Sequence, residues 1–402
     1  MASTLLHRKE GALLGAFVAD AASLGFHWLY DPKRIAELTA STGTPEFRSP
    51  SEKDFEGVFG YFAHGARRNG DLTMYGEHLL TAVKAVAESD GDWNPFLFQS
   101  IFAQTFDRGG SYVGYIDGAT NGTLDNLKKL QGESLARAFE AIGGQSSIPE
   151  EAQPYFAKYT EKLGVTKRGE ALQTAMENLL TERFNNKELG AKARQFAKFY
   201  DEHRPTRSGV ASDNQVSGFA KVPAVVVALA GRANLLEKVE EAVRLTNDND
   251  ECVAFGLYAA KVLEKVLLGS TVEDSLQAAL QVPMEDEKLH VVEQVQKALQ
   301  GSAMPPPSLA ETFGMPCPMP NCVPLSVAIL KQTPTYTAAV RTNILCGGDN
   351  AGRSIIIGSI LGAAHGVGGA SGIPLEWIGR TLHIDALTAT VSRAVHGQGS
   401  KL

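Results

Sequence analysis

The chain has 402 residues, a formal net charge of −7 and a hydrophobic share of 44%. That share is sufficient for a large core, and no long stretch has the composition of a disordered chain. Because no Lys/Arg cluster offsets the acidic balance, the composition argues against a nucleic-acid partner. Four cysteines in a chain of this length do not indicate a disulfide scaffold.

Two features bear on where the protein is found. The N-terminus lacks a basic region followed by an apolar core and a cleavage site. The apolar run over residues 11–26 contains Asp20 and is too short to span a bilayer. We therefore expect a cytoplasmic protein with no membrane partner. The C-terminal tripeptide Ser-Lys-Leu would be a peroxisomal address if the source is eukaryotic.

Helical periodicity dominates the chain. The pattern predicts amphipathic or buried helices over residues 77–88, 96–106, 134–142, 168–182, 187–201, 234–245, 251–268, 272–280, 286–299 and 322–331. A capping-box pattern from Ser270 to Glu273 predicts one helix start, and Ser212-Asp213 is a second candidate. The run Val222-Pro-Ala-Val-Val-Val-Ala-Leu-Ala predicts a buried helix, because alanines flank it and no partner strand is evident.

Two segments have the composition of linkers, residues 41–58 and 301–309. In the second, Ala303-Met-Pro-Pro-Pro-Ser308 is expected to be non-helical because of its prolines. Neither an internal repeat nor an alternation of strands and helices is evident. The sequence therefore predicts one all-α domain over residues 1–402, a compact orthogonal bundle of many helices.

The segment 354–369 has glycines at positions 358, 362 and 366. A four-residue glycine spacing lays a flat stripe along a helix, so a neighbouring backbone can approach closely. We therefore expect a tightly packed central helix. His365 on this helix is interpreted as a hydrogen-bonded core histidine rather than a ligand.

The most informative motif precedes that helix and reads Cys346-Gly-Gly-Asp349-Asn-Ala-Gly-Arg353-Ser354. Its glycines allow a tight turn and close approach to a ligand. The Asp349 carboxylate then stands at the mouth of the helix, where it could hold a metal or a substrate hydroxyl. It could also be only a helix cap.

Two further segments accompany this motif, Gly11–Trp28 and Asn69–Glu77. In order and spacing, the three segments resemble the ADP-ribosylglycohydrolase family over nearly the whole chain. Leu24–Asp31, Gly114–Thr120 and Gly314–Pro320 resemble the branch that contains the J-type jellyfish lens crystallins. The resemblance implies the same all-α fold and hydrolysis of an N- or O-glycosidic bond at the ribose C1″, assisted by two divalent cations, usually Mg²⁺.

The metal-binding patterns of the family are altered in this chain. The pattern Thr-Asp-Asp-Thr reads Gly70-Asp71-Leu72-Thr73, and Asp-x-Asp-Thr reads Asp349-Asn350-Ala351-Gly352. A family glutamate corresponds to His27. Two carboxylates remain, Asp71 and Asp349, with Thr73 and Asn350 as neutral oxygen donors. Such a set predicts at most one weakly bound divalent ion.

The resemblance and the residue types together suggest catalytic roles. Asp71 and Asp349 would orient water and substrate, and His27 would move the proton. Arg353 stands four residues after Asp349, a spacing that allows a carboxylate–guanidinium contact on a helix. The alternatives are a structural histidine and an exposed helix arginine.

Candidate substrate contacts lie beside these residues. The Gly/Tyr loop over residues 109–120 offers flat aromatic faces and polar groups. In the proline-rich segment 313–322, a cysteine could be a nucleophile or a small packed side chain. The predicted substrate-binding residues are Thr73, Tyr75, Tyr112, Tyr115, Asp117, Cys317 and Asn350.

Three functions fit these observations. The first is a hydrolase of the ADP-ribosylglycohydrolase type that cleaves a glycosidic or related C–N bond of a small polar or ADP-ribosyl substrate. The second is a metal-independent enzyme for another small polar substrate, with Cys317 or His27 at its centre. The third is a non-catalytic binding or structural protein of the crystallin kind. The partner is in each enzymatic case a small molecule, and no oligomeric state is indicated.

Overall fold

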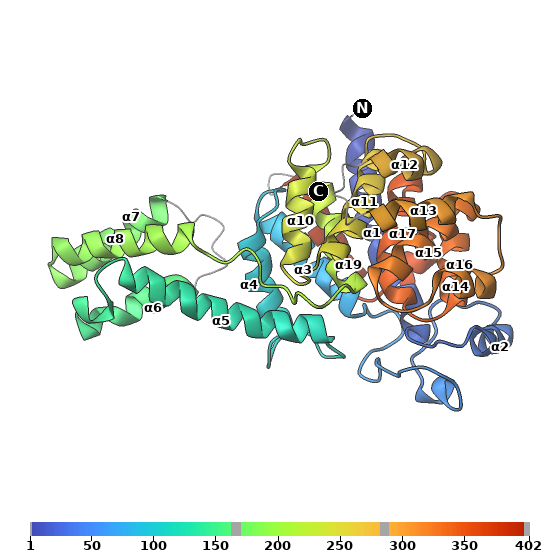
Figure 1. Ribbon diagram of the computed structural model, residues 1–402, viewed down its shortest axis with the longest axis horizontal. Helices are drawn as coiled ribbons and strands as arrows, with labels where there is room; N and C mark the ends of the chain where they lie inside the picture. The colour runs from blue at the N-terminus through green and yellow to red at the C-terminus, as the bar shows by residue number, and fades with distance from the viewer. Residues whose placement is uncertain (1, 162–169, 282–288, 398–402) are drawn as a thin grey trace.

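A computed structural model describes residues 2–161, 170–281 and 289–397 (Figure 1). Over these ranges the chain contains α-helices and short 3-10 turns, and its only β-structure consists of isolated bridges. The predicted all-α class is therefore confirmed. None of the described helices is long and apolar enough to cross a membrane.

The helices fall into a main bundle and a projecting arm. The bundle is built from α1 (Ala2–Ser23), α2 (Pro32–Thr42), α3 (Met74–Glu88), α4 (Pro95–Phe106), α9 (Val222–Leu229), α10 (Leu235–Arg244), α11 (Asp250–Leu267), α12 (Val272–Ala278), α13 (Leu289–Gln300), α14 (Pro306–Phe313), α15 (Met319–Gln332), α16 (Tyr336–Cys346), α17 (Asn350–His365), α18 (Leu375–Arg380) and α19 (Ile384–His396). The arm comprises α5 (Gly118–Glu140), α6 (Gln153–Glu161), α7 (Glu170–Phe184) and α8 (Lys187–Glu202).

The arm has a hydrophobic core of its own. Phe139, Phe156, Leu180 and Phe196, one from each of its helices, are buried together and separately from the bundle core. Figure 1 shows α6, α7 and α8 beside the outer part of α5, away from the bundle. The arm meets the bundle core through the inner part of α5, where Leu124 and Leu127 are buried.

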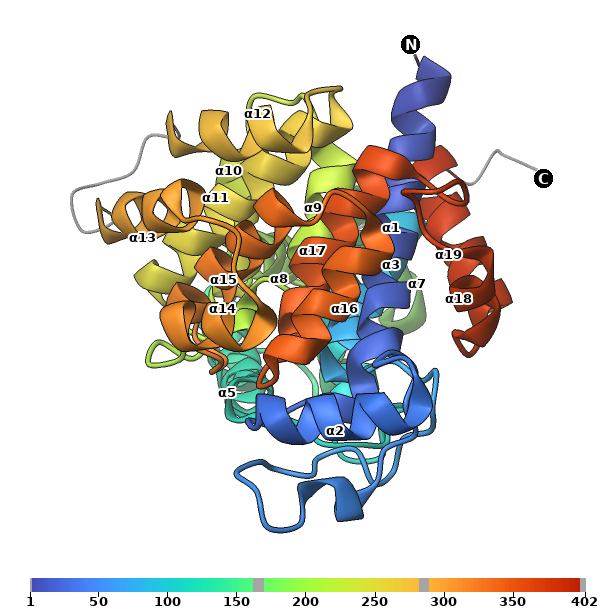
Figure 2. The ribbon, with the colours of Figure 1, turned by 90° about the vertical axis from the view of Figure 1, so that its right-hand side faces the viewer.

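The helices α1 and α17 cross at the centre of the bundle (Figure 2). Glycines permit their contact: a Cβ on Gly15 would lie 2.2 Å from the carbonyl oxygen of Gly358, and one on Gly362 would lie 2.1 Å from that of Gly11. The predicted central helix and two glycines of its stripe are thus confirmed. The third, Gly366, instead ends the helix with φ +66°.

This crossing predicts opposite effects for two glycine-to-alanine changes. Gly15→Ala should lower the free energy of unfolding by about 1–3 kcal/mol, because the added methyl overpacks the contact with Gly358. Gly132, in α5, is the matched control, because a methyl group added there would meet no atom within 4 Å. Gly132→Ala should raise the free energy by up to about 1 kcal/mol. Urea unfolding of both variants measures the difference, and equal effects would contradict the close crossing.

Several predicted boundaries are corrected by the structure. The expected helix 134–142 is only the end of α5, which begins at Gly118 because Asp117 caps it. The segment expected to be non-helical contains the start of α14, since prolines are tolerated in a first turn, where no backbone donor is needed. Residues 168–169 and 286–288 of two predicted helices lie outside the described residues.

The helix starts follow the capping rules with one shift. Thr271, not Ser270, caps α12 by accepting a hydrogen bond from the Asp274 N–H at 3.1 Å. Asp213 accepts one from the Gln215 N–H at 2.9 Å, so it forms a turn before a 3-10 segment rather than starting an α-helix. The run beginning at Val222 is helical, as predicted.

His365 departs from its predicted role. It lies in the last turn of α17, is exposed, and lines a surface cavity. The interpretation as a buried, hydrogen-bonded core histidine is therefore wrong, because the helix leaves the core before it reaches this residue.

Candidate functional site

Three loops meet along the extended segment that follows α1. The N–H of Trp28 donates to the Gly348 carbonyl at 2.9 Å, and the N–H of Gly348 donates to the Leu29 carbonyl at 2.7 Å. On the other side, the N–H of Tyr61 donates to the Trp28 carbonyl at 3.0 Å. This backbone pairing places His27 between the loop that leads to His64 and the turn that leads to Asp349.

The Gly-Gly turn has a steric reason. Gly347 and Gly348 have φ values of +75° and +63°, which other residues rarely adopt. A Cβ on Gly348 would lie 2.4 Å from the Met315 carbonyl oxygen. Glycine at both positions lets the turn fit between residue 29 and residue 315, and the following Asp349 becomes the N-cap of α17.

The Asp349 carboxylate is fully buried, and each of its oxygens has a donor. Oδ1 lies 3.1 Å from His27 Nε2 and accepts from the Gly352 N–H at 2.9 Å. Oδ2 accepts from the Tyr75 hydroxyl at 2.8 Å. Burial alone would raise the pKa of Asp349, but His27 first, and then hydrogen bonds from Cys317 and the Gly352 N–H, lower the pKa to about 2. The carboxylate is therefore ionised at neutral pH.

His27 connects this carboxylate to a second histidine. His27 Nδ1 lies 2.6 Å from His64 Nε2, and the two rings stack at 4.9 Å between centroids. Both side chains are 3% exposed. Burial, reinforced by the neighbouring His27 and Arg67, places the pKa of His64 well below its ordinary value, so His64 is neutral.

The carboxylate determines where the protons lie on both rings. An ionised Asp349 can only accept, so His27 carries a proton on Nε2, and in the neutral form of its ring it offers a lone pair at Nδ1. His64 must then donate from Nε2, which leaves the lone pair of its own Nδ1 free. That atom is buried and has no hydrogen-bond partner among the residues that the structure describes. We name this chain, Asp349–His27–His64, the histidine relay.

Cys317 lies beside the relay. The indole N–H of Trp28 donates to its sulfur at 3.2 Å, and the Tyr30 hydroxyl lies 3.8 Å from it. Burial and the nearby Asp349 charge raise the pKa of the Cys317 thiol well above its ordinary value. The thiol is therefore protonated at neutral pH, which does not favour Cys317 as a nucleophile.

Aromatic rings lead from the relay toward solvent. The His27 ring lies 4.4 Å from Trp28, and Trp28 packs edge-on against Tyr115 at 4.9 Å. Tyr61 contacts both Trp28 and Tyr115 and is 57% exposed. We call Trp28, Tyr61 and Tyr115 the aromatic wall. It offers flat apolar faces close to the buried relay.

Two predicted residues make their contacts elsewhere. Asp71 accepts from the Arg68 N–H at 2.7 Å and shares no hydrogen-bond partner with Asp349 in the described chain. Thr73 caps α3 and donates to Asp20, its hydroxyl at 2.5 Å and its N–H at 2.7 Å. Asp71 and Thr73 therefore hold the loop before α3, from which Tyr75 reaches Asp349.

Arg353 has a structural position in the turn. It is fully buried, and its Nε donates to Asn343 Oδ1 at 2.7 Å while Nη2 donates to the Gly347 carbonyl at 2.5 Å. The expected contact with the Asp349 carboxylate is not formed in the described structure, because the guanidinium donates its hydrogen bonds to backbone carbonyls instead. Asn350 likewise donates to backbone, at 3.1 Å from the Phe26 carbonyl.

The two tyrosines of the Gly/Tyr loop, residues 109–120, contact different parts of the protein. Tyr115 belongs to the aromatic wall, whereas the ring of Tyr112 packs under the Arg67 guanidinium at 5.0 Å. Asp117 is 2% exposed and caps α5 through the Thr120 N–H at 2.7 Å. Burial raises the pKa of Asp117, and the Asp349 charge adds to this rise.

Comparison with known proteins identifies the family. The ADP-ribosylglycohydrolase family model matches residues 1–401. The chain belongs to the ADP-ribosylglycohydrolase family. Crystallin J1A and Crystallin J1B of Tripedalia cystophora are each 23% identical to it, over 93% of this chain and 92% of theirs. A solved structure titled ADP-ribosylglycohydrolase-related protein complex shares the fold, with a TM-score of 0.58, 13% identity and coverage of 98% and 99% of the two chains.

ADP-ribosylglycohydrolases commonly bind Mg²⁺, but the residues at this site do not fit that ion. Oδ1 of Asp349 accepts from His27 and from the Gly352 N–H, and Oδ2 accepts from the Tyr75 hydroxyl, so most of the capacity of this carboxylate is used within the protein. Asp71 bonds to its own loop. No group of three or more His, Cys, Asp or Glu able to hold a metal occurs within residues 2–161, 170–281 and 289–397. Mg²⁺ requires several hard oxygen ligands together.

The sequence alone does not predict His64 of the histidine relay or Tyr61 of the aromatic wall. His64 and Tyr61 belong to a loop with no periodic pattern, and no local motif marks Tyr30 or Asp20 as a site residue. A histidine within the Gly/aromatic run Gly60-Tyr-Phe-Ala-His64-Gly65 is the available signal. Their meeting depends on pairing between loops far apart in the sequence.

Proposed function

We propose that this member of the ADP-ribosylglycohydrolase family is a hydrolase that cleaves a glycosidic C–N or C–O bond of a ribosyl substrate without a metal ion. The observation that carries the proposal is the histidine relay, whose ionised carboxylate leaves a free lone pair on His64 Nδ1. A general base needs a free lone pair that can accept a proton from the attacking water, and His64 Nδ1 would supply it. Family membership supports the ribosyl substrate class.

In the proposed reaction, a water molecule attacks the anomeric carbon and gives a proton to His64 Nδ1. His64 then shares the positive charge with His27 across their 2.6 Å contact, and Asp349 compensates it. The bond from the anomeric carbon to the leaving nitrogen or oxygen breaks with its electron pair going to the leaving group. That group takes up the proton from the imidazolium, which restores the relay.

The other residues position the reacting groups. The aromatic wall supplies a face on which a planar ring of the substrate would stack. Tyr75 fixes one carboxylate oxygen, and Arg353 fixes the turn that carries Asp349. We propose that Asp71, Thr73, Asn350 and Cys317 act as positioning residues rather than as ligands of a cation.

The proposal predicts hydrolysis that does not depend on divalent ions. Purified protein should release ribose-containing product from an ADP-ribosyl conjugate or a smaller riboside at a rate changed by less than about twofold by a chelator or by added Mg²⁺. Product release is followed by chromatography, with conjugates tried before smaller ribosides and amides. Activity that appears only with Mg²⁺ would contradict the proposal.

A non-catalytic role is the second candidate. It is favoured by the hydrogen bonds that both Asp349 oxygens accept within the protein, and by the similarity to two proteins named crystallins. On this alternative, no ribosyl substrate is turned over and substitution of His64 changes stability alone. The same chromatographic assay therefore separates the two candidates.

A further inference from the structure

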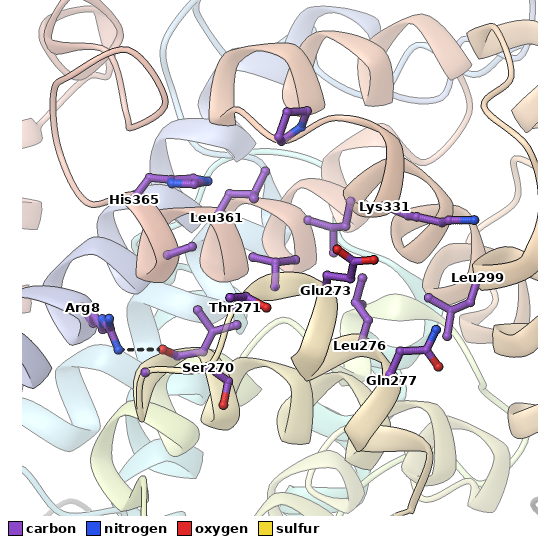
Figure 3. A pocket seen from close by; sticks show the side chains of 16 residues that line it. Arg8, Ser270, Thr271, Glu273, Leu276, Gln277, Leu299, Lys331, Leu361 and His365 are labelled. Atoms are coloured by element: carbon purple, nitrogen blue, oxygen red, sulfur yellow. Dashed lines mark hydrogen bonds between the residues drawn. The ribbon is translucent and has the colours of Figure 1, made fainter.

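A surface cavity of about 500 Å³ opens at the end of α17 opposite to the relay. It lies among α1, α11, α12, α13, α15 and α17, and Figure 3 shows its lining side chains converging from these elements. Because α17 has 16 residues, its two ends lie roughly 22 Å apart at about 1.5 Å per residue. The cavity is therefore separate from the relay, and its volume is typical of small-molecule sites.

The floor of the cavity is apolar. Three leucines of the hydrophobic core line it, Leu276, Leu330 and Leu361. Each side chain is at most 4% exposed, so the bottom of the cavity is formed by well-packed core residues. The apolar lining residues are Val266, Val272, Leu276, Leu299, Leu330, Pro334, Leu361 and Ala364. A floor of this kind favours the hydrocarbon part of a ligand over water or a sugar.

The rim of the cavity is basic although the chain as a whole is acidic. Figure 3 shows Arg8 and His365 on one side and Lys331 on the other, with Glu273 as the carboxylate between them. The rim therefore has two permanent positive charges against one negative charge.

These basic groups retain unused donors. One terminal nitrogen of Arg8 donates to the carbonyls of Val266 and Leu267, at 3.3 and 3.5 Å. Within the described residues, its other guanidinium nitrogens have no protein acceptor. Among the described residues, Lys331 donates to the Gly301 carbonyl at 2.7 Å. An anionic group at the rim would accept these remaining donors.

We propose that this cavity binds a small amphipathic carboxylate, with its hydrocarbon chain on the leucine floor and its carboxylate at the Arg8 rim. The apolar floor and the basic rim each select for one half of such a molecule. A phosphate or a sugar would satisfy the rim but leave the floor unfilled, and a neutral alcohol would fill the floor without using the rim.

Isothermal titration calorimetry with octanoate tests the proposal on the full-length protein. Octan-1-ol and acetate are the comparison probes, because each supplies only one half of the ligand. Two variants are used: Arg8→Gln removes the rim charge, and Ala364→Phe fills the cavity from the last turn of α17. Arg393→Gln, an exposed position in α19, is the charge-matched control.

Octanoate is expected to bind at one site in the wild type and in Arg393→Gln. Its Kd should rise by about 10-fold or more in Arg8→Gln and in Ala364→Phe. Octan-1-ol and acetate should bind at least about 10-fold more weakly than octanoate. Absence of octanoate binding, equal binding by octan-1-ol, or unchanged binding in Arg8→Gln would each overturn the proposal. Because Arg8 is only half-buried, its variant tests the rim contact even where Ala364→Phe fails to fold.

Discussion

Replacing His64 by glutamine should lower kcat for the ribosyl substrate by about 100- to 10,000-fold, the usual contribution of a general base. Glutamine keeps a hydrogen-bonding side chain next to His27 but has no lone pair of comparable basicity. The fold should persist, because His64 is neutral and belongs to a loop rather than to a helix of the core. Single-turnover rates on folded protein, checked by circular dichroism, measure the effect.

His78 is the matched control for this change. It is fully buried, one ring nitrogen lies 3.0 Å from the Thr120 hydroxyl, and its Nδ1 has no partner in the described structure. Burial places the pKa of His78 well below its ordinary value, as it does for His64. His78 has no carboxylate–histidine chain behind it, so His78→Gln should leave kcat nearly unchanged. Equal losses in the two variants would contradict the relay.

Asp349→Asn should have a comparable effect on turnover and a measurable effect on stability. Asparagine caps a helix about as well as aspartate, so the loss of stability reports the charge rather than the cap. The folded pKa of about 2 lies below the usual value of an aspartate, so the ionised carboxylate stabilises the fold by about 2–3 kcal/mol. kcat should fall because no negative charge remains to compensate the imidazolium.

The pH dependence of this variant follows from the direction of the shift. The contribution of Asp349 is fully present above the ordinary aspartate pKa, near pH 4, and is lost as the pH falls through about 2. The stability difference between wild type and Asp349→Asn should therefore be largest at neutral pH and shrink toward pH 2. Asp31→Asn, which changes the cap of α2 by the same atoms, should leave the activity unchanged. A difference independent of pH would contradict the ionised, buried carboxylate.

The sequence is sufficient to predict the helical class and the turn before α17. Periodic apolar residues identify most bundle helices, and the paired glycines before Asp349 allow a tight turn that other residues rarely adopt. The glycines at 358 and 362 also predict a close helix contact, which α1 supplies through Gly11 and Gly15. These features depend on local chemistry, so a single sequence contains them.

Features that depend on distant contacts could not be predicted in the same way. Arg353 sits at a helix position where most arginines are exposed, and its burial depends on carbonyls supplied by residues 315, 343 and 347. The partnership of His64 with His27 depends on backbone pairing between residues 28–30 and 59–61. The spacing from Asp349 marks Arg353 and the surrounding glycine and aromatic residues mark His64, but neither signal predicts these contacts.

The central claim is that an ionised Asp349 fixes the protons on His27 and His64. Proton–nitrogen correlation spectra of protein with isotope-labelled histidine measure this directly, with His27 and His64 assigned by substitution among the nine histidines. At neutral pH His64 should be neutral, with its proton on Nε2 and Nδ1 unprotonated, His27 should carry a proton on Nε2, and Asp349→Asn should alter this pattern. A His64 ring that is protonated on Nδ1, or charged at neutral pH, would contradict the relay.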